Sequence, residues 1–143
     1  MKPQGTWQLF TLGSALFAGL TTVLGKVGVS GINSNLATLL RTVVILAFIC
    51  GIVASRGEWQ PPQSLPRRSL VFLVLSGIST GASWLCYYRA LQLGPASRVA
   101  PLDKLSVVIA VVLALAFLRE TLTLKAALGS AFIAFGAVLL SLP

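Results

Sequence analysis

Five apolar stretches, each long enough to cross a membrane, account for most of this chain. A transmembrane helix needs roughly 20 apolar residues, because it rises about 1.5 Å per residue through a hydrocarbon core about 30 Å thick. We therefore predict an all-α integral membrane protein, a bundle of about five transmembrane helices. The expected spans are residues 7–29, 33–55, 69–93, 96–118 and 124–142.

The composition argues against a water-soluble domain. Of the 143 residues, 56% are hydrophobic and 10% are charged, and the mean hydropathy is +0.91. A soluble chain of this length buries only about two thirds of its unfolded surface, so the apolar excess must face the lipid bilayer. The net charge of +8 does not indicate a nucleic-acid partner, because the basic residues are scattered singly and form no patch or stripe.

The connections between the spans are short, with one exception. Residues 56–68 form a long polar connection whose Pro61, Pro62 and Pro66 are expected to exclude helix. The stretch from Trp7 to Val29 is too long for the roughly 7 to 15 apolar residues of a cleaved signal, so it is expected to remain as the first helix. With no internal repeat, residues 1–143 are predicted to form a single transmembrane domain.

An odd number of spans has a consequence for assembly. A second copy of a five-helix unit placed in tandem would enter the membrane in the opposite orientation, as in inverted-repeat transporters. A lone unit therefore needs a partner chain, and we expect a homodimer, antiparallel or otherwise, or a pair with a similar subunit.

Basic residues near the helix ends predict the orientation, because they accumulate on the cytoplasmic side. The N-terminal side carries six and the opposite side three, or five if Arg41 and Lys104 are added, which favours a cytoplasmic N-terminus in the cell membrane. The near balance of the second count leaves room for insertion in both orientations. The six are Lys2, Arg56, Arg67, Arg68, Arg119 and Lys125, and the three are Lys26, Arg89 and Arg98.

Several ionisable residues fall inside the spans, and four of them lie at least about four residues from a span end: Arg41, Arg89, Asp103 and Lys104. Each costs about 2.5 to 3.5 kcal/mol near the membrane centre on insertion scales, so such residues rarely persist without a partner or a function. The second and fourth spans begin on the side where the third ends, so all four are predicted to lie in the same half of the bilayer. Lys26, near the end of the first span, joins them and leaves a surplus of positive charge.

Two interpretations of these charges stay open. In the functional one, Arg41 or Arg89 meets an anionic solute in a hydrated cavity, and Asp103 and Lys104 form a pair that is rearranged during transport. In the structural one, Asp103 ties two helices together through Arg41, while Arg89 and Lys104 extend to the membrane surface.

Helical spacing places further candidates on shared faces. Trp84 and Tyr88 lie on the same face as Gly77 and Gly81, and form either an aromatic wall for a solute or a packing groove below an interfacial aromatic belt.

Asp103 lies on a face of small residues and is expected to point into the bundle. The rest of that face is Ala100, Ser106, Ala110 and Ala114. Pro101 predicts a kink just before Asp103.

Enzymatic chemistry has almost no residues to use here. The chain has no His, no paired carboxylates, no metal-ligand cluster and no phosphate-binding glycine loop, so we expect neither an enzyme nor a cofactor. A transporter is the first hypothesis, and a membrane subunit whose buried charges serve assembly is the alternative.

Several motifs resemble the EamA domain of the drug/metabolite transporter superfamily. They are the segment WLCYYRALQLGPASRVAPLDKLS at residues 84–106, Arg41 within LATLLRTVVILA, the turn LRETL at residues 118–122, and Gly129 with Gly136. The resemblance covers nearly the whole chain, and Arg119 stands where the family's L-G-E-x-L signature has glycine. The small multidrug resistance family is related, but its cation exporters share a first-helix glutamate that this chain lacks.

The resemblance implies a function and an assembly. Full-length relatives carry two five-helix domains, so this chain resembles the single-domain branch of bacterial and archaeal transporters. Secondary transport of small metabolites or drugs is implied, through a dimer of half-units. A surplus of cations near the candidate site makes an anionic small molecule the more natural cargo.

Overall fold

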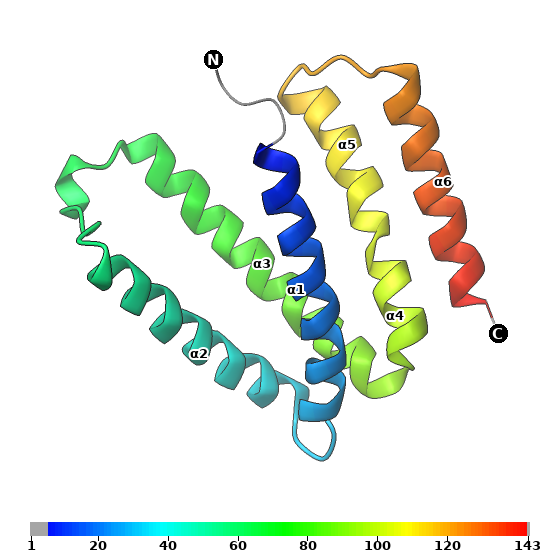
Figure 1. Cartoon of the computed structure of the whole chain (residues 1–143), viewed down its shortest axis with the longest axis horizontal. Helices are drawn as coiled ribbons and strands as arrows, with labels where there is room; N and C mark the ends of the chain where they lie inside the picture. Colours follow the sequence, from blue (N-terminus) through cyan, green and yellow to red (C-terminus); the bar gives the residue numbers. More distant parts are fainter. Residues whose placement is uncertain (1–5, 143) are drawn as a thin grey trace. The chain divides into compact units, whose positions relative to one another are not determined.

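The computed structural model describes residues 6–142, which form helices joined by connections of different lengths and contain no strand (Figure 1). Five helical spans in this range are long and apolar enough to cross a membrane, as predicted. Their boundaries lie within two residues of the predicted ones. The helices are α1 (Thr6–Gly28), α2 (Ser34–Ser55), α3 (Arg67–Leu93), α4 (Ala96–Asp103), α5 (Leu105–Phe117) and α6 (Leu124–Ser141). Lys2, used to predict the orientation, lies outside the described residues.

Local chemistry explains where the helices begin. The Asn33 side chain accepts a hydrogen bond of 2.8 Å from the amide of Asn35 and caps α2. Thr123 caps α6 in the same way, through the amide of Ala126 at 3.2 Å. Gly31, in the turn before α2, has φ 83°, a conformation that other residues rarely adopt. The polar connection was predicted to contain no helix, but its residues Pro62–Ser64 form a single 3-10 turn, η1.

The fourth span is interrupted, so the single helix predicted over residues 96–118 is divided into α4 and α5. The break lies at Lys104, immediately after Asp103, whereas Pro101 predicted a kink immediately before it. Around the break the hydrogen bonds shorten to the i to i−3 pattern, from the Lys104 amide to Pro101 and from the Val107 amide to Lys104. The disturbance therefore lies C-terminal to the proline.

The chain divides into two compact units, each described by itself. One comprises Met1–Lys26 and Leu93–Pro143, and we call it the α4–α6 unit after its packed helices. There α6 packs against both α4 and α5 through a stripe of small side chains spaced three or four residues apart. Small side chains let helix backbones approach closely in lipid. The stripe is Ala127, Ser130, Ala134, Ala137 and Ser141.

The other unit, Val27–Gln92, is called the α2–α3 unit. Figure 1 shows α2 and α3 running in opposite directions and drawn apart toward the connection between them. Its buried side chains gather at the other end, where Val29 and Leu91 are 1% and 0% exposed. The two helices are therefore held together near the turn that precedes α2, and diverge away from it.

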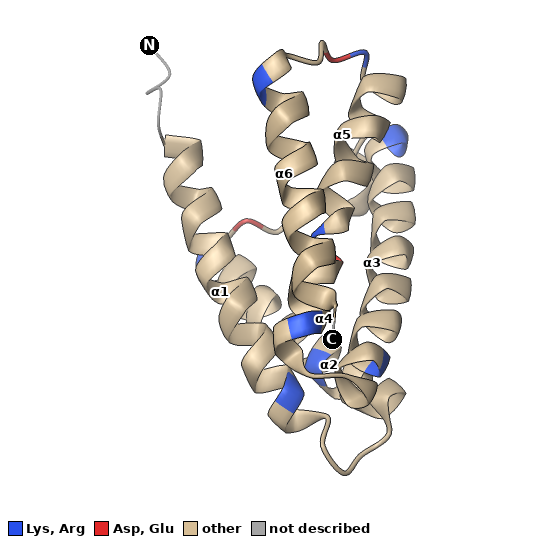
Figure 2. Cartoon of the chain, turned by 90° about the vertical axis from the view of Figure 1, so that its right-hand side faces the viewer, with Lys and Arg blue, Asp and Glu red and all other residues tan. Residues whose placement is uncertain are grey.

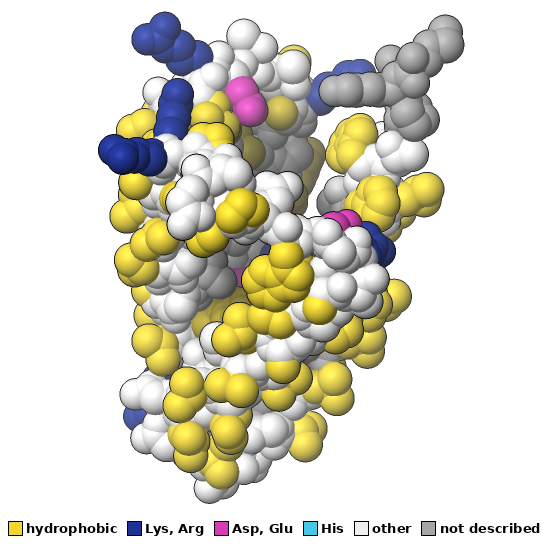
Figure 3. Space-filling view, turned by 90° about the vertical axis from the view of Figure 1, so that its left-hand side faces the viewer, with side chains coloured by type: hydrophobic (Ala, Val, Ile, Leu, Met, Phe, Trp, Pro, Cys, Tyr) yellow, Lys and Arg dark blue, Asp and Glu magenta, His cyan; other side chains and the backbone are white. Residues whose placement is uncertain are grey.

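The outer surface is apolar, as expected of helices that face lipid. Large hydrophobic side chains are exposed along every span, and they cover much of the face drawn in Figure 3. Basic residues lie mostly at helix ends and in connections (Figure 2), as with Lys26, Arg56 and Lys125. This distribution confirms a multi-pass membrane protein.

Candidate functional site

A cation of α2 stacks on two aromatic rings of α3. The guanidinium carbon of Arg41 on α2 lies 3.9 Å from the ring centroid of Trp84 and 5.5 Å from that of Tyr88, both on α3. Tyr88 is 5% exposed, and Arg41 and Trp84 are half-buried. Trp84 and Tyr88 share a face, as their four-residue spacing predicted, and Arg41 faces them from the neighbouring helix. Such cation–π contacts contribute about 0.5 to 2 kcal/mol.

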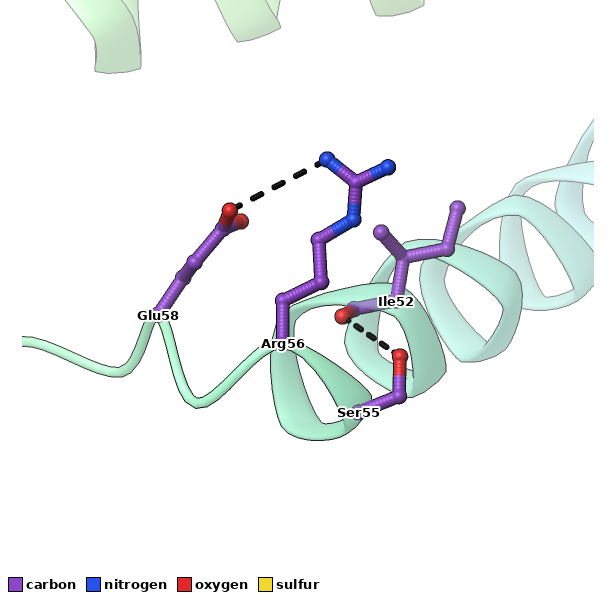
Figure 4. Close-up of polar contacts among 4 residues, drawn as sticks. All are labelled: Ile52, Ser55, Arg56 and Glu58. Atoms are coloured by element: carbon purple, nitrogen blue, oxygen red, sulfur yellow. Dashed lines mark hydrogen bonds and ion pairs between the residues drawn. The ribbon is translucent and has the colours of Figure 1, made fainter.

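The charge of Arg41 is not neutralised within its unit. Glu58 is the only carboxylate between Val27 and Gln92, and it lies in the polar connection beyond the end of α2. There its Oε1 lies 3.9 Å from Nη1 of Arg56, next to the α2 end where the Ser55 hydroxyl donates to the Ile52 carbonyl (Figure 4). Arg41 therefore presents a positive charge that aromatic faces stabilise and no carboxylate of the unit balances.

A groove runs from the Arg41 cluster along α2 and α3. Its volume is about 480 Å³, within the range of small-molecule sites. Trp84 belongs to both the cluster and the groove, and Thr42 of the groove directly follows Arg41 in the chain. The lining residues are Thr42, Ile45, Leu46 and Ile49 of α2 with Leu73, Ser76, Gly77, Thr80, Gly81 and Trp84 of α3.

Arg89, a predicted site residue, does not stack on the aromatic rings and instead forms a hydrogen bond within its own helix. It is exposed, and its Nη1 donates to Oε1 of Gln92 at 3.0 Å. The Gln92 amide in turn donates to the carbonyls of Ile32 at 2.6 Å and Val29 at 3.3 Å. Gln92 thus ties the end of α3 to the turn before α2, a role that sequence reasoning missed because one glutamine in a last helical turn carries no periodic signal.

Asp103 and Lys104 belong to the α4–α6 unit. Their side chains lie 3.6 Å apart, between Lys104 Nζ and Asp103 Oδ2, and are 54% and 38% exposed for the lysine and the aspartate. They therefore form the predicted pair. The pairing of Asp103 with Arg41 would join the two units and stays a prediction.

The small-residue face predicted around Asp103 is interrupted after the break. Ala100, Asp103 and Ala114 are half-buried, in agreement with the prediction, whereas Ser106 and Ala110 are exposed, contrary to it. A 3-10 turn rotates each residue by about 120°, and an α-helix by about 100°, so the turn at Lys104 changes the face that α5 presents. The half-buried side chains of α5 include Leu105, Val108, Val111, Ala114 and Leu115.

Lys26, the other cation of the predicted group, serves the structure. Its Nζ donates to the carbonyl of Gly94 at 2.9 Å, just after α3 ends. A cation beside the unpaired carbonyls at a helix end is stabilising. Among residues 6–142, no three His, Cys, Asp or Glu side chains are grouped so that they could hold a metal ion.

Comparison with known proteins identifies the family of this chain. Residues 5–142 match the EamA-like transporter family. A relative described as an uncharacterized transporter in the cobO 3' region of Sinorhizobium sp. is 58% identical over 136 residues, 95% of this chain and 96% of the relative. An uncharacterized protein of Methanocaldococcus jannaschii is 37% identical over 76 residues, 53% of this chain and 56% of that protein. No solved structure matches. The chain therefore belongs to the EamA-like transporter family and is a multi-pass membrane transporter.

Proposed function

We propose that this protein is a secondary transporter that binds an anionic small molecule at Arg41, Trp84 and Tyr88. One observation carries the proposal: Arg41 is a half-buried cation within a membrane span, it stacks on Trp84 at 3.9 Å, and its unit has no carboxylate to pair with it in the span. A charge kept in a span at a cost of a few kcal/mol indicates a partner or a function, and a solute anion is the partner that a transporter would supply.

The transporter works by alternating access as a dimer of half-units in the cell membrane. Because the chain crosses the membrane five times, its N- and C-terminal ends lie on opposite sides of the bilayer. A second chain in the opposite orientation would therefore complete an inverted pair. The exposed apolar side chains of all five spans provide surface for a partner as well as for lipid. The N-terminus is cytoplasmic in the orientation that the positive residues favour.

Counterflow in proteoliposomes tests the solute site. Vesicles containing the full chain are loaded with one of acetate, lactate, succinate, glutamate, benzoate or octanoate, and uptake of the same labelled anion is measured. We expect at least one anion to be exchanged, and Arg41→Gln to abolish that exchange while membrane insertion is unchanged. Arg98→Gln removes an exposed positive charge from α4 and serves as the matched control. Equal exchange by Arg41→Gln and the wild type would contradict the proposal.

Reporter fusions and cross-linking test the assembly. A cytoplasmic and a periplasmic reporter are placed after Pro143 in separate strains, and single cysteines at exposed positions report contacts between copies. Activity on both sides together with a cross-linked dimer would support an antiparallel pair of half-units. A single orientation would support a parallel dimer or a second subunit, and a strictly monomeric chain that still transports would refute the dimer.

A further inference from the structure

The groove beside Arg41 is apolar over nearly its full length. Its α2 side presents Ile45, Leu46 and Ile49, and Leu73 lines it on α3. The two threonines that line it turn their hydroxyl groups toward their own helices: Thr42 donates to the Thr38 carbonyl at 2.8 Å and Thr80 to the Ser76 carbonyl at 2.9 Å. These donors are thus unavailable to a ligand, and the walls favour a hydrocarbon surface.

The groove and the cation are arranged end to end. Arg41 lies against Trp84, which lines one end, and the lining of α3 continues through Gly81 and Gly77 to Leu73. From Trp84 to Leu73 is eleven residues along one helix, which is about 16 Å at about 1.5 Å per residue, and the part up to Gly77 is about 10 Å. A ligand that filled both parts would carry a negative charge at one end and an apolar body about 10 Å long.

We infer that the substrate class is an amphipathic organic anion, such as a medium-chain carboxylate, whose carboxylate pairs with Arg41 while its hydrocarbon body lies along the groove. This inference rests on the proposed function and adds to it the apolar part of the substrate. The charge of Arg41 selects an anion over a neutral molecule, and the groove selects a ligand with an apolar body over a compact polar one such as lactate or succinate.

Two glycines keep the groove open on its α3 side. A Cβ atom added at Gly77 or Gly81 would meet no other atom within 4 Å, so a side chain there would project into open space and not displace a neighbour. The same holds for Gly129 on α6, in the other unit. Substitution at Gly77 can thus shorten the groove, and the same substitution at Gly129 controls for the change of glycine itself.

Trp84 can report binding directly. In the full chain carrying Trp7→Phe and Trp59→Phe, Trp84 is the only tryptophan. This protein is reconstituted into phosphatidylcholine vesicles, and its fluorescence is titrated with butanoate, hexanoate and octanoate and with the corresponding neutral amides, corrected for partition into the lipid. The titrations are repeated with Arg41→Gln, Gly77→Leu and Gly129→Leu added to this background.

We expect Kd to fall with chain length, because a buried methylene contributes about 0.8 kcal/mol, or about fourfold in affinity. Octanoate should bind at least about tenfold more tightly than butanoate, and octanoate more tightly than octanamide. Arg41→Gln should remove the preference for octanoate over its amide. Gly77→Leu should weaken octanoate about tenfold and leave butanoate unchanged, whereas Gly129→Leu should change neither.

Several results would overturn the inference. If the carboxylates bind in an Arg41-dependent way but chain length has no effect, the anion site stands and the apolar groove has no part in it. If no carboxylate affects Trp84 and Arg41→Gln retains counterflow, the proposed site fails as well. If phosphatidylglycerol vesicles change the fluorescence and block octanoate, a lipid headgroup occupies the site. If Gly77→Leu abolishes dimer cross-linking with no effect on octanoate binding, the groove receives a helix of a second copy.

Discussion

Arg41 and Trp84 face each other across two helices, with the guanidinium carbon 3.9 Å from the centre of the ring system. The N–H donors of a guanidinium lie in its plane, so stacking on a ring face leaves them directed outward from the stack. An arginine held in this way keeps its charge and its fork of donors while its flat face is covered. Such a group suits the recognition of a carboxylate, whose two oxygens can accept paired hydrogen bonds.

Replacing Trp84 should weaken solute binding in proportion to the lost cation–π contact. Trp84→Phe keeps a smaller ring, and we expect a loss of about twofold to fivefold in affinity, whereas Trp84→Leu should lose about tenfold or more. The measurement is the concentration of anion that half-saturates counterflow. Trp59→Leu, in the exposed connection, serves as the control. Equal affinities for the phenylalanine and leucine variants would show that the ring face is not used.

Neutralising Asp103 separates a transport role from an assembly role. Asp103→Asn removes the carboxylate that lies 3.6 Å from Lys104 Nζ, and we expect it to abolish counterflow while insertion and thermal stability change little. If instead Asp103→Asn and Arg41→Gln each misfold and the double variant recovers, the two residues form a structural ion pair. Glu120→Gln, a carboxylate outside the helices, should leave transport intact.

Gln92 should contribute to stability through its bonds to the turn before α2. Gln92→Leu removes its two donated hydrogen bonds and leaves the carbonyls of Val29 and Ile32 without this donor. Polar contacts between transmembrane segments contribute about 0.6 to 2 kcal/mol each, so we expect a destabilisation of about 1 to 3 kcal/mol. Reversible unfolding in detergent measures it. Gln63→Leu, in the polar connection, should have no such effect, and equal stability of the two variants would refute this role.

Arg119 occupies a backbone conformation that suits glycine. Its φ is 55°, in the left-handed region, directly after α5 ends at Phe117 with Leu118 as its cap. A side chain costs about 1 to 2 kcal/mol there, so Arg119→Gly should stabilise the protein by about 1 kcal/mol or less, since glycine also gains entropy in the unfolded chain. Thermal unfolding measures the change, and Glu120→Gly is the neighbouring control. A lower melting temperature for Arg119→Gly would contradict this account.

Position 119 shows what a sequence pattern can predict and what it cannot explain. The family signature has a glycine where Arg119 stands, but the signature alone gives no reason for it. The positive φ gives the position a physical reason for glycine, which only the backbone conformation could reveal. Similarly, Pro101 predicted a disturbance in the fourth span, but the tight turn at Lys104 determined its position and the face of α5.

The sequence by itself determined the membrane environment, the five spans and the shared face of Trp84 and Tyr88, because hydropathy and helical periodicity are local properties. Tertiary structure alone decided that Arg41 stacks on Trp84, that Gln92 holds the end of α3, and that α2 and α3 enclose an apolar groove. These relationships join residues about 25 to 65 positions apart, and their geometry depends on the angle between helices. Side-chain packing between the turn before α2 and the end of α3 sets that angle, and no local pattern encodes it.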